Sequence, residues 1–192
     1  MARMKIHNDR NAPEKSLPTL KIFKEAKGRV PNLLGVGAAS PILLQAMSDM
    51  FAHFRHTSLE IEETELVILA ACREYGNACA LEYQSYMARE EGVADHVIES
   101  VREKRPGDEP WQDERYNALW AFVVAVIATG GAVEDDEVKA FKKAGFSDEH
   151  MLEVLIGIHL ASLFSHVARL AQLKPDPKFR WHSAGIFPWR RK

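Results

Sequence analysis

The sequence has few cysteines, no strongly basic region and no apolar segment at its start. Only 2 of its 192 residues are cysteines, which argues against a secreted fold held together by disulfides. The formal net charge is -2 and the basic residues form no stripe, so nucleic-acid binding has no electrostatic basis. Because no apolar signal segment follows the N-terminus, export is not predicted and a cytoplasmic location is expected.

Long hydrophobic runs are also scarce. Two long stretches without Asp, Glu, Lys or Arg are 116–133 and 154–168, whereas a membrane span needs about 20 mostly apolar residues. The first stretch ends in two glycines and the second contains two histidines, so both are predicted to be buried core helices rather than membrane spans. A helix that is apolar on nearly every side is buried on nearly every side. Two such helices are hard to cover in one copy of the chain, and we therefore expect a homo-oligomer.

The rest of the chain is typical of a soluble globular protein. Hydrophobic residues make up 46% and charged residues 27%, and the length suffices for one domain with a core. Apolar residues recur at helical spacing and no alternating strand pattern competes with them, which predicts an all-α fold. The expected helices are 17–27, 41–57, 58–76, 77–91, 94–105, 111–128, 134–144 and 147–173.

These helices imply a simple domain organisation. Residues 1–15 are polar and predict a flexible N-terminal arm. Residues 16–174 form the helical domain, and residues 175–192 form an irregular C-terminal tail, because the Pro175-Asp176-Pro177 run stops the last helix.

Glu65 is the strongest candidate for a chemical role. On a helix it shares a face with Ile68, Leu69 and Cys72. A carboxylate on an apolar face is costly to bury unless it is paired, hydrogen-bonded or protonated. Glu65 is therefore either a general acid/base group or a structural carboxylate that a neighbouring helix satisfies.

The cysteines are weaker candidates. Cys79 lies near the start of a predicted helix, where a thiol can have a lowered pKa, but a buried free cysteine often serves as a small hydrophobe. Seven residues of continuous helix rise about 10 Å between Cys72 and Cys79, and a disulfide needs Cα atoms within about 7 Å. Only a sharp break at Gly76 would bring this pair together.

The histidines do not form a metal-binding pattern. His159 and His166 lie two helical turns apart, whereas helical metal pairs use i, i+3 or i, i+4 spacing. His53 and His56 have that spacing but no further ligand nearby. We therefore expect core or interface histidines at 159 and 166, surface or cleft histidines at 53 and 56, and neither a metal nor a cofactor.

The segment ELVILAACREYGNACALEYQSYMAREEGV, residues 65–93, resembles the core of the carboxymuconolactone decarboxylase family, which includes the AhpD-like alkylhydroperoxidases. The PN-L turn at 31–34, the KAGFSD turn at 143–148 and Asp176-Pro177 extend the resemblance over roughly residues 17–180. It implies an AhpD-like helical domain with antiparallel helix hairpins, assembled as a trimer, hexamer or dimer.

The resemblance fails where the chemistry of the family lies. In the peroxidase branch a glutamate is followed by cysteines twelve and fifteen residues later and by a histidine four residues after that. Counting from Glu65, these places hold Asn77, Ala80 and Gln84, and counting back from Gly92 also gives Gln84. The redox dithiol and the histidine are therefore absent. Glutamine forms hydrogen bonds but does not shuttle a proton near neutral pH.

Decarboxylase-type relatives carry Glu followed by an aromatic residue at the second cysteine. Here Glu82-Tyr83 comes two residues late, which turns the pair by about 200° on a helix. The chain therefore departs from both branches of the family.

Three functions remain open. In the first, Glu65 acts as the acid/base on, or helps to bind, a small organic acid or lactone, with Tyr83 and Gln84 as substrate-binding partners. In the second, Cys79 alone reduces hydroperoxides in a peroxiredoxin-like reaction, and an external thiol resolves its sulfenic acid. In the third, the protein is a non-catalytic binding or scaffold oligomer. A Glu65 fully paired with an arginine, without an adjoining pocket, would favour the third.

Overall fold

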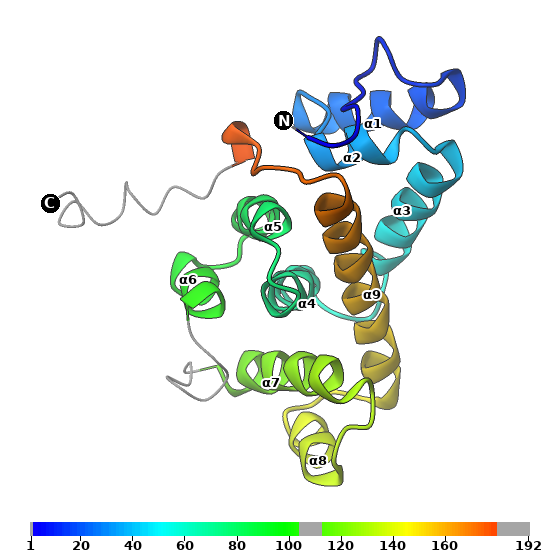
Figure 1. Cartoon of the computed structure of the whole chain (residues 1–192). Helices are drawn as coiled ribbons and strands as arrows, with labels where there is room; N and C mark the ends of the chain where they lie inside the picture. Colours follow the sequence, from blue (N-terminus) through cyan, green and yellow to red (C-terminus); the bar gives the residue numbers. More distant parts are fainter. Residues whose placement is uncertain (1, 104–112, 180–192) are drawn as a thin grey trace, which may run out of the picture.

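The computed structural model describes residues 2–103 and 113–179, and within these ranges the regular secondary structure is helical, with no strand (Figure 1). This confirms the predicted all-α class. Residues 104–112, which include the first residues of the helix expected from 111, and residues 180–192, most of the predicted tail, lie outside the described residues. The elements are η1 (Glu14–Ser16), α1 (Leu17–Lys27), α2 (Asn32–Gly37), α3 (Pro41–Phe54), α4 (Ile61–Glu74), α5 (Ala78–Glu90), α6 (Asp95–Glu103), α7 (Glu114–Thr129), α8 (Asp135–Lys143), α9 (Asp148–Leu170) and η2 (Pro177–Phe179).

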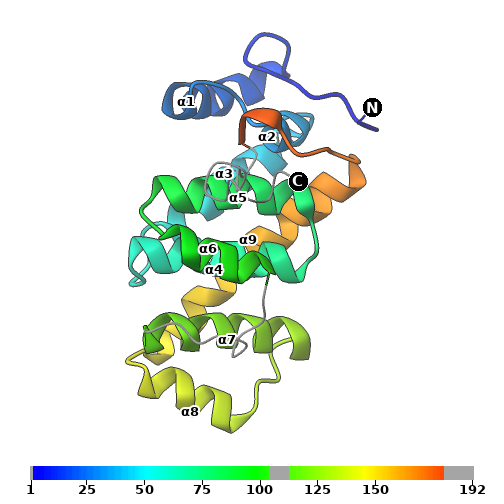
Figure 2. The ribbon, with the colours of Figure 1, turned by 90° about the vertical axis from the view of Figure 1, so that its left-hand side faces the viewer.

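Helix α4 is the central element of the fold. Every residue from 63 to 72 is buried, because α5, α7 and α9 all pack against this helix (Figures 1 and 2). The consecutive helices α4 and α5 contact each other, as do α7 and α8, as expected of helix hairpins. Between residues 63 and 72 the helix has no solvent-facing side for its polar residues. Each carboxylate on it therefore needs a partner within the protein.

Local sequence signals set most helix boundaries. The predicted start of α3 is confirmed, since the Ser40 hydroxyl accepts a hydrogen bond from the Leu43 amide at 3.3 Å and Pro41 occupies the first helical position. The helix expected from 58 begins three residues later, at Ile61, because Glu60 and Glu63 form a reciprocal capping box there.

The PN-L segment was expected to be a turn, and this expectation is wrong. Residues Asn32–Gly37 form the short helix α2, which follows Pro31. Its two glycines obscure the helical pattern because glycine has a low helix propensity. At Gly35 a tertiary contact requires glycine, since a Cβ there would lie 2.5 Å from the backbone oxygen of His7.

Both predicted terminal segments contact the helical body. In the N-terminal arm, the amide of His7 donates to the Gly35 oxygen at 2.9 Å and the amide of Arg3 donates to the Ala171 oxygen at 2.7 Å. In the C-terminal segment, the side chain of Phe179 is buried and its ring meets those of Tyr83 and Tyr86 edge-on, with centroids 5.1 and 5.2 Å away. The two segments thus cover parts of α2, α5 and the end of α9.

Helix α9 packs against α3, α4 and α5 on one side. Among the described helices it is long and apolar enough to cross a membrane by length and composition, but its packing is that of a core helix. A Cβ at Gly157 would lie 2.5 Å from Phe54 and 2.6 Å from Val67, so α9 crosses α3 and α4 at close range. The opposite face of α9 includes the exposed residues Leu152, His159, His166 and Leu170. That a second copy of the chain covers this face stays a prediction.

Candidate functional site

Glu65 lies at the centre of a polar network that joins three helices. Its side chain is 0% exposed, and Oε1 lies 2.5 Å from Nη1 of Arg55, the residue that ends α3. The side-chain amide of Gln84, on α5, donates a hydrogen bond to Oε2. Arg55 also pairs with Glu91, whose Oε2 lies 3.1 Å from Nη2. The structure therefore brings Glu65 and Gln84 together and adds an arginine that sequence reasoning missed.

This network satisfies the buried carboxylate. Each oxygen of Glu65 receives a donor from a different helix, and one donor carries the compensating positive charge. Charge-assisted hydrogen bonds of this kind are among the strongest in proteins. Gln84 thus holds Glu65 in place, and its amide cannot move a proton.

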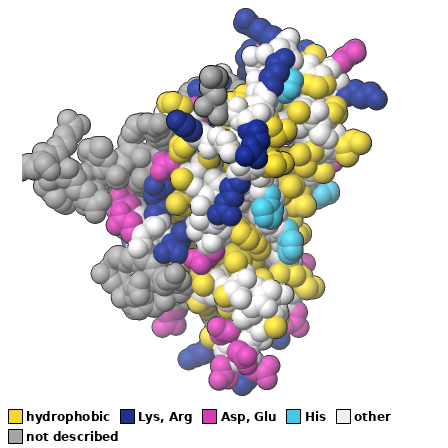
Figure 3. Space-filling view, in the orientation of Figure 1, with side chains coloured by type: hydrophobic (Ala, Val, Ile, Leu, Met, Phe, Trp, Pro, Cys, Tyr) yellow, Lys and Arg dark blue, Asp and Glu magenta, His cyan; other side chains and the backbone are white. Residues whose placement is uncertain are grey.

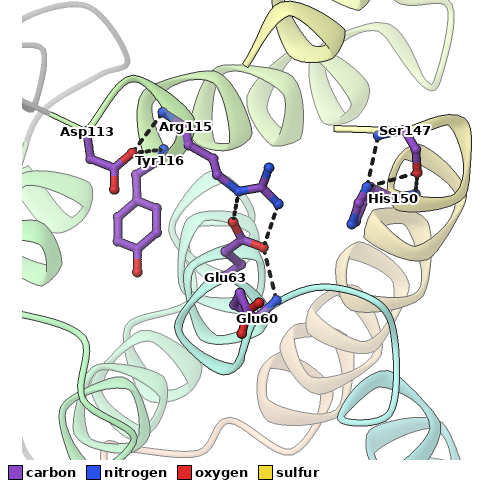
Figure 4. Close-up of polar contacts among 7 residues, drawn as sticks. All are labelled: Glu60, Glu63, Asp113, Arg115, Tyr116, Ser147 and His150. Carbon is purple, nitrogen blue, oxygen red and sulfur yellow. Dashed lines mark hydrogen bonds and ion pairs between the residues drawn. The ribbon is translucent and has the colours of Figure 1, made fainter. Parts of the chain in front are cut away.

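A second buried carboxylate on α4 is satisfied in the same way (Figure 4). Glu63 is almost completely buried and accepts hydrogen bonds from Arg115, on α7, and from the Glu60 amide at 3.0 Å. The Arg115 guanidinium also lies 3.9 Å from the centroid of the Phe146 ring. Glu63 has a structural role as a cap and an interhelical ion pair, and Glu65 resembles it in having an arginine partner.

An apolar pocket lies beside this network. It is a hollow of about 370 Å³ when the part open to solvent is counted, with room of about 20 Å³ for the centres of water-sized molecules. Glu65 is not among the lining residues. The walls come from α1, α2, α3, α5 and α9 and consist of Phe23, Pro31, Leu33, Leu34, Met47, Phe51, Tyr83 and Phe164.

Two lining residues connect the pocket to the network. The ring of Phe51 lies 5.9 Å from the Arg55 guanidinium, and Tyr83 is adjacent in sequence to Gln84. Burial first, and the charges of Glu65 and Tyr86 next, raise the pKa of Tyr83 well above its usual range, so its hydroxyl keeps its proton. Within residues 2–103 and 113–179 this hydroxyl has no hydrogen-bond partner.

The environment of Cys79 does not activate its thiol. Although Asn77 caps the helix and accepts from the Cys79 amide at 2.9 Å, the side chain is only 8% exposed. Burial and, next, the charge of Asp176 raise the pKa of the Cys79 thiol to about 11. The Sγ atom lies 3.6 Å from the Lys174 carbonyl oxygen. A helix N-terminus can lower a thiol pKa, but burial outweighs that effect here.

Cys72 is fully buried and its pKa is raised even further, first by burial and then by Cys79 and Glu65. The chain does break at Gly76, where φ is 61°, yet both thiols are free. The structure therefore holds two protonated thiols rather than a disulfide.

In the part of the chain that the structure describes, no group of three or more His, Cys, Asp and Glu side chains is placed to hold a metal ion. His159 and His166 are exposed, and their Nδ1 atoms lie 2.7 Å from the Leu155 oxygen and 3.4 Å from the Ser162 hydroxyl on the same helix. His53 and His56 are exposed near the end of α3. These four histidines are thus on the surface, as expected for 53 and 56. A core position for 159 and 166 is wrong, and an interface position stays a prediction.

Comparison with known proteins identifies the fold of this chain but no family by sequence. No family model matches the chain, and no curated protein matches it in sequence. A solved structure from Ralstonia eutropha JMP134, described as an alkylhydroperoxidase AhpD core and an uncharacterized peroxidase-related protein, superimposes with a TM-score of 0.80 at 17% identity, covering 93% of this chain and 94% of the other. The chain has the AhpD-like fold.

Two further structures support the AhpD-like fold. An uncharacterized peroxidase-related protein from Silicibacter sp. TM1040 matches with a TM-score of 0.77 at 16% identity, over 93% of this chain and 97% of the other. The debrominase Bmp8 matches with a TM-score of 0.73 at 14% identity, over 86% of this chain and 88% of the other. At these identities the likeness is one of fold.

Proposed function

We propose that this protein binds a small, uncharged and mainly apolar organic molecule in the pocket beside Tyr83, without thiol chemistry. The carrying observation is that Tyr83, whose hydroxyl stays protonated and has no partner among the described residues, lines a pocket whose other lining side chains are apolar. Ligand sites typically combine an apolar wall with a few polar groups that orient the ligand. Tyr83 fits this pattern as a donor to one acceptor, such as a lactone carbonyl oxygen.

The charge of the site favours a lactone over an organic acid. A carboxylate that enters an apolar pocket loses its hydration and needs a cation nearby. No Lys or Arg is among the lining residues, and the guanidinium of Arg55 is already engaged by Glu65 and Glu91. A neutral carbonyl needs only the donor that Tyr83 supplies.

The position of Glu65 favours binding over acid/base catalysis. A general base must come within hydrogen-bond reach of the proton that it removes, but Glu65 is 0% exposed and both its oxygens already have donors. We assign it the role of holding α3 and α5 around the pocket. Glu65 is therefore a positioning residue in this proposal.

Another protein with the AhpD-like fold binds a small organic molecule. One solved structure with the fold is a cysteine-to-alanine variant of the debrominase Bmp8 in complex with 2,3,4-tribromopyrrole, a small aromatic molecule. That likeness, at a TM-score of 0.71 and 14% identity, suggests a probe rather than a substrate for this chain.

Peroxide reduction by Cys79 is a less favoured reading. The thiolate is the reactive form of cysteine, and a pKa of about 11 leaves about one thiol in ten thousand ionised at pH 7. The alternative remains testable, since a peroxidatic cysteine would form a trappable sulfenic acid.

The test is ligand titration followed by heteronuclear NMR. The probes are δ-valerolactone, its ring-opened hydroxy acid and 2,3,4-tribromopyrrole, and the expected result is that the lactone shifts pocket resonances whereas the acid does not. Tyr83→Phe should weaken lactone binding by about two- to tenfold, the value of one hydrogen bond. The matched control is Tyr86→Phe, because Tyr86 also contacts Phe179 but does not line the pocket.

Two results would contradict the proposal. One is equal or tighter binding of the hydroxy acid, which would require a cation in the site. The other is an unchanged lactone affinity in Tyr83→Phe. If Glu65→Gln instead abolishes a measured lactone hydrolysis while binding persists, acid/base chemistry replaces binding as the function.

A further inference from the structure

An apolar stripe runs along the outer face of α9. Its members follow one another at alternating steps of four and three residues, the spacing of a coiled-coil seam. Leu152 and Leu170, at its two ends, are 68% and 61% exposed. In the orientation of Figure 1, hydrophobic and histidine side chains gather on the side formed by α3 and α9 (Figure 3). The α9 stripe comprises Leu152, Ile156, His159, Leu163, His166 and Leu170.

We propose that the α9 stripe is the contact surface for a second copy of this chain, with the two α9 helices antiparallel about a twofold axis. Such an arrangement centres near residue 161. It places Leu152 opposite the partner's Leu170, Ile156 opposite the partner's His166, and His159 opposite the partner's Leu163. The twofold axis repeats these three pairs, so two apolar end layers enclose four layers that each contain one histidine.

Charge complementarity selects the antiparallel direction. The first turn of α9 is acidic, with Asp148 and Glu149, whereas Arg169 lies in its last turn and Lys174 follows it. An antiparallel pair brings the acidic end of each helix to the basic end of the other, and a parallel pair brings like charges together. Between 154 and 168 there is no charged residue, so the middle of the stripe opposes neither arrangement.

The area of the stripe predicts a reversible dimer. A helix of 23 residues is about 34 Å long, and a face about 10 Å wide buries roughly 340 Å² per copy, below the roughly 800 Å² of a standard interface. The neighbouring surface of α3 adds to this area, since α3 packs beside α9 and carries Ile42, which is 84% exposed. A membrane surface is a poorer occupant, because amphipathic helices that bind lipid carry Lys and Arg on their polar flanks.

The first experiment is sedimentation velocity on the full chain over a wide concentration range. The wild type should shift from monomer to dimer, and Leu163→Arg should weaken association at least tenfold. The matched control is Ile22→Arg, because Ile22 is 65% exposed on α1, away from the stripe. His159→Glu repeats the test at an exposed position, where folding is not at stake. A monomer at every concentration, or dimerisation that neither stripe variant weakens, would overturn the proposal.

The second experiment tests the direction by oxidative crosslinking. Ser162→Cys lies close to the proposed axis and should form a disulfide with its own copy. Leu152→Cys should not, because in an antiparallel pair the two positions 152 lie about 27 Å apart. Wild type controls for Cys72 and Cys79, which are buried. Crosslinking of Leu152→Cys, whether or not Ser162→Cys also crosslinks, would establish a parallel pair and overturn the antiparallel model. Binding of monomers to phosphatidylglycerol vesicles through this face would replace the second copy with a membrane.

Discussion

Removing Arg55 should cost more stability than removing the charge of Glu65 itself. Arg55→Met leaves a carboxylate that is 0% exposed and keeps the hydrogen bond from Gln84 but loses the paired positive charge. Breaking a buried ion pair from one side typically costs about 3–5 kcal/mol, because the other charge stays buried without compensation. Since Arg55 is 20% exposed, so that water reaches its guanidinium, we expect about 3 kcal/mol, at the lower end of that range.

Glu65→Gln should be milder. The amide is neutral and of similar size, and Arg55 keeps its pair with Glu91 and its contact with water. We expect a loss of about 1–2 kcal/mol, the scale of one charge-assisted hydrogen bond. In the double variant Arg55→Met/Glu65→Gln no charge is stranded, so stability should recover by about 1–2 kcal/mol relative to Arg55→Met.

The measurement is the free energy of unfolding of all four proteins by urea denaturation at pH 7, with the slope of each transition checked for constancy. The order of stability expected is wild type, Glu65→Gln, the double variant, then Arg55→Met. Two results would contradict this expectation. One is that the two substitutions change the free energy of unfolding additively, and the other is that Glu65→Gln lowers it as much as Arg55→Met does. The second result would mean that Glu65 contributes through contacts other than this ion pair.

Three further predictions concern the thiol, the helix crossing and the C-terminal contact. Alkylation of Cys79 by iodoacetamide should be very slow at pH 7 and rise about tenfold per pH unit up to its pKa of about 11, and rapid dimedone trapping at low peroxide would contradict this. Gly157→Ala should lower the free energy of unfolding by about 1–2 kcal/mol. The cost of overpacking against Phe54 exceeds the gain of about 1 kcal/mol in helix propensity. A raised melting temperature would be inconsistent with the close crossing of α9 over α3. Phe179→Ala should lower the free energy of unfolding by about 3 kcal/mol. It should also weaken lactone binding, because the Phe179 ring packs against that of Tyr83. Unchanged stability and binding would show that this contact is dispensable.

The positions of the helices follow from local signals in the sequence. Caps such as Ser40 and breaks such as Gly76 act within one turn of the chain, so a reader of the sequence finds the helix ends to within a few residues. Helix α2 was not predicted, because Gly35 is required by a tertiary contact with the N-terminal arm. A local sequence pattern does not predict such a tertiary contact.

In the candidate site, too, some features follow from the local sequence and others only from the tertiary structure. The pattern around Glu65 predicts a carboxylate on an apolar face, and the missing dithiol and histidine are visible by counting. The partner of that carboxylate, Arg55, carries no local signal, because the same arginine on a free helix end would be an ordinary surface residue. The pocket walls come from five helices, and no window of the sequence contains them together.

By itself, the sequence determined an all-helical chain without the family's redox pair, because helical periodicity, caps and residue identity are local properties. Only the tertiary structure decided what the remaining chemical groups can do. It placed Arg55 and Gln84 on Glu65, raised the pKa of Cys79 by burial and set Tyr83 in the wall of an apolar pocket. The state of a charge or a proton depends on the groups that surround it in space, and folding brings those groups from distant parts of the chain.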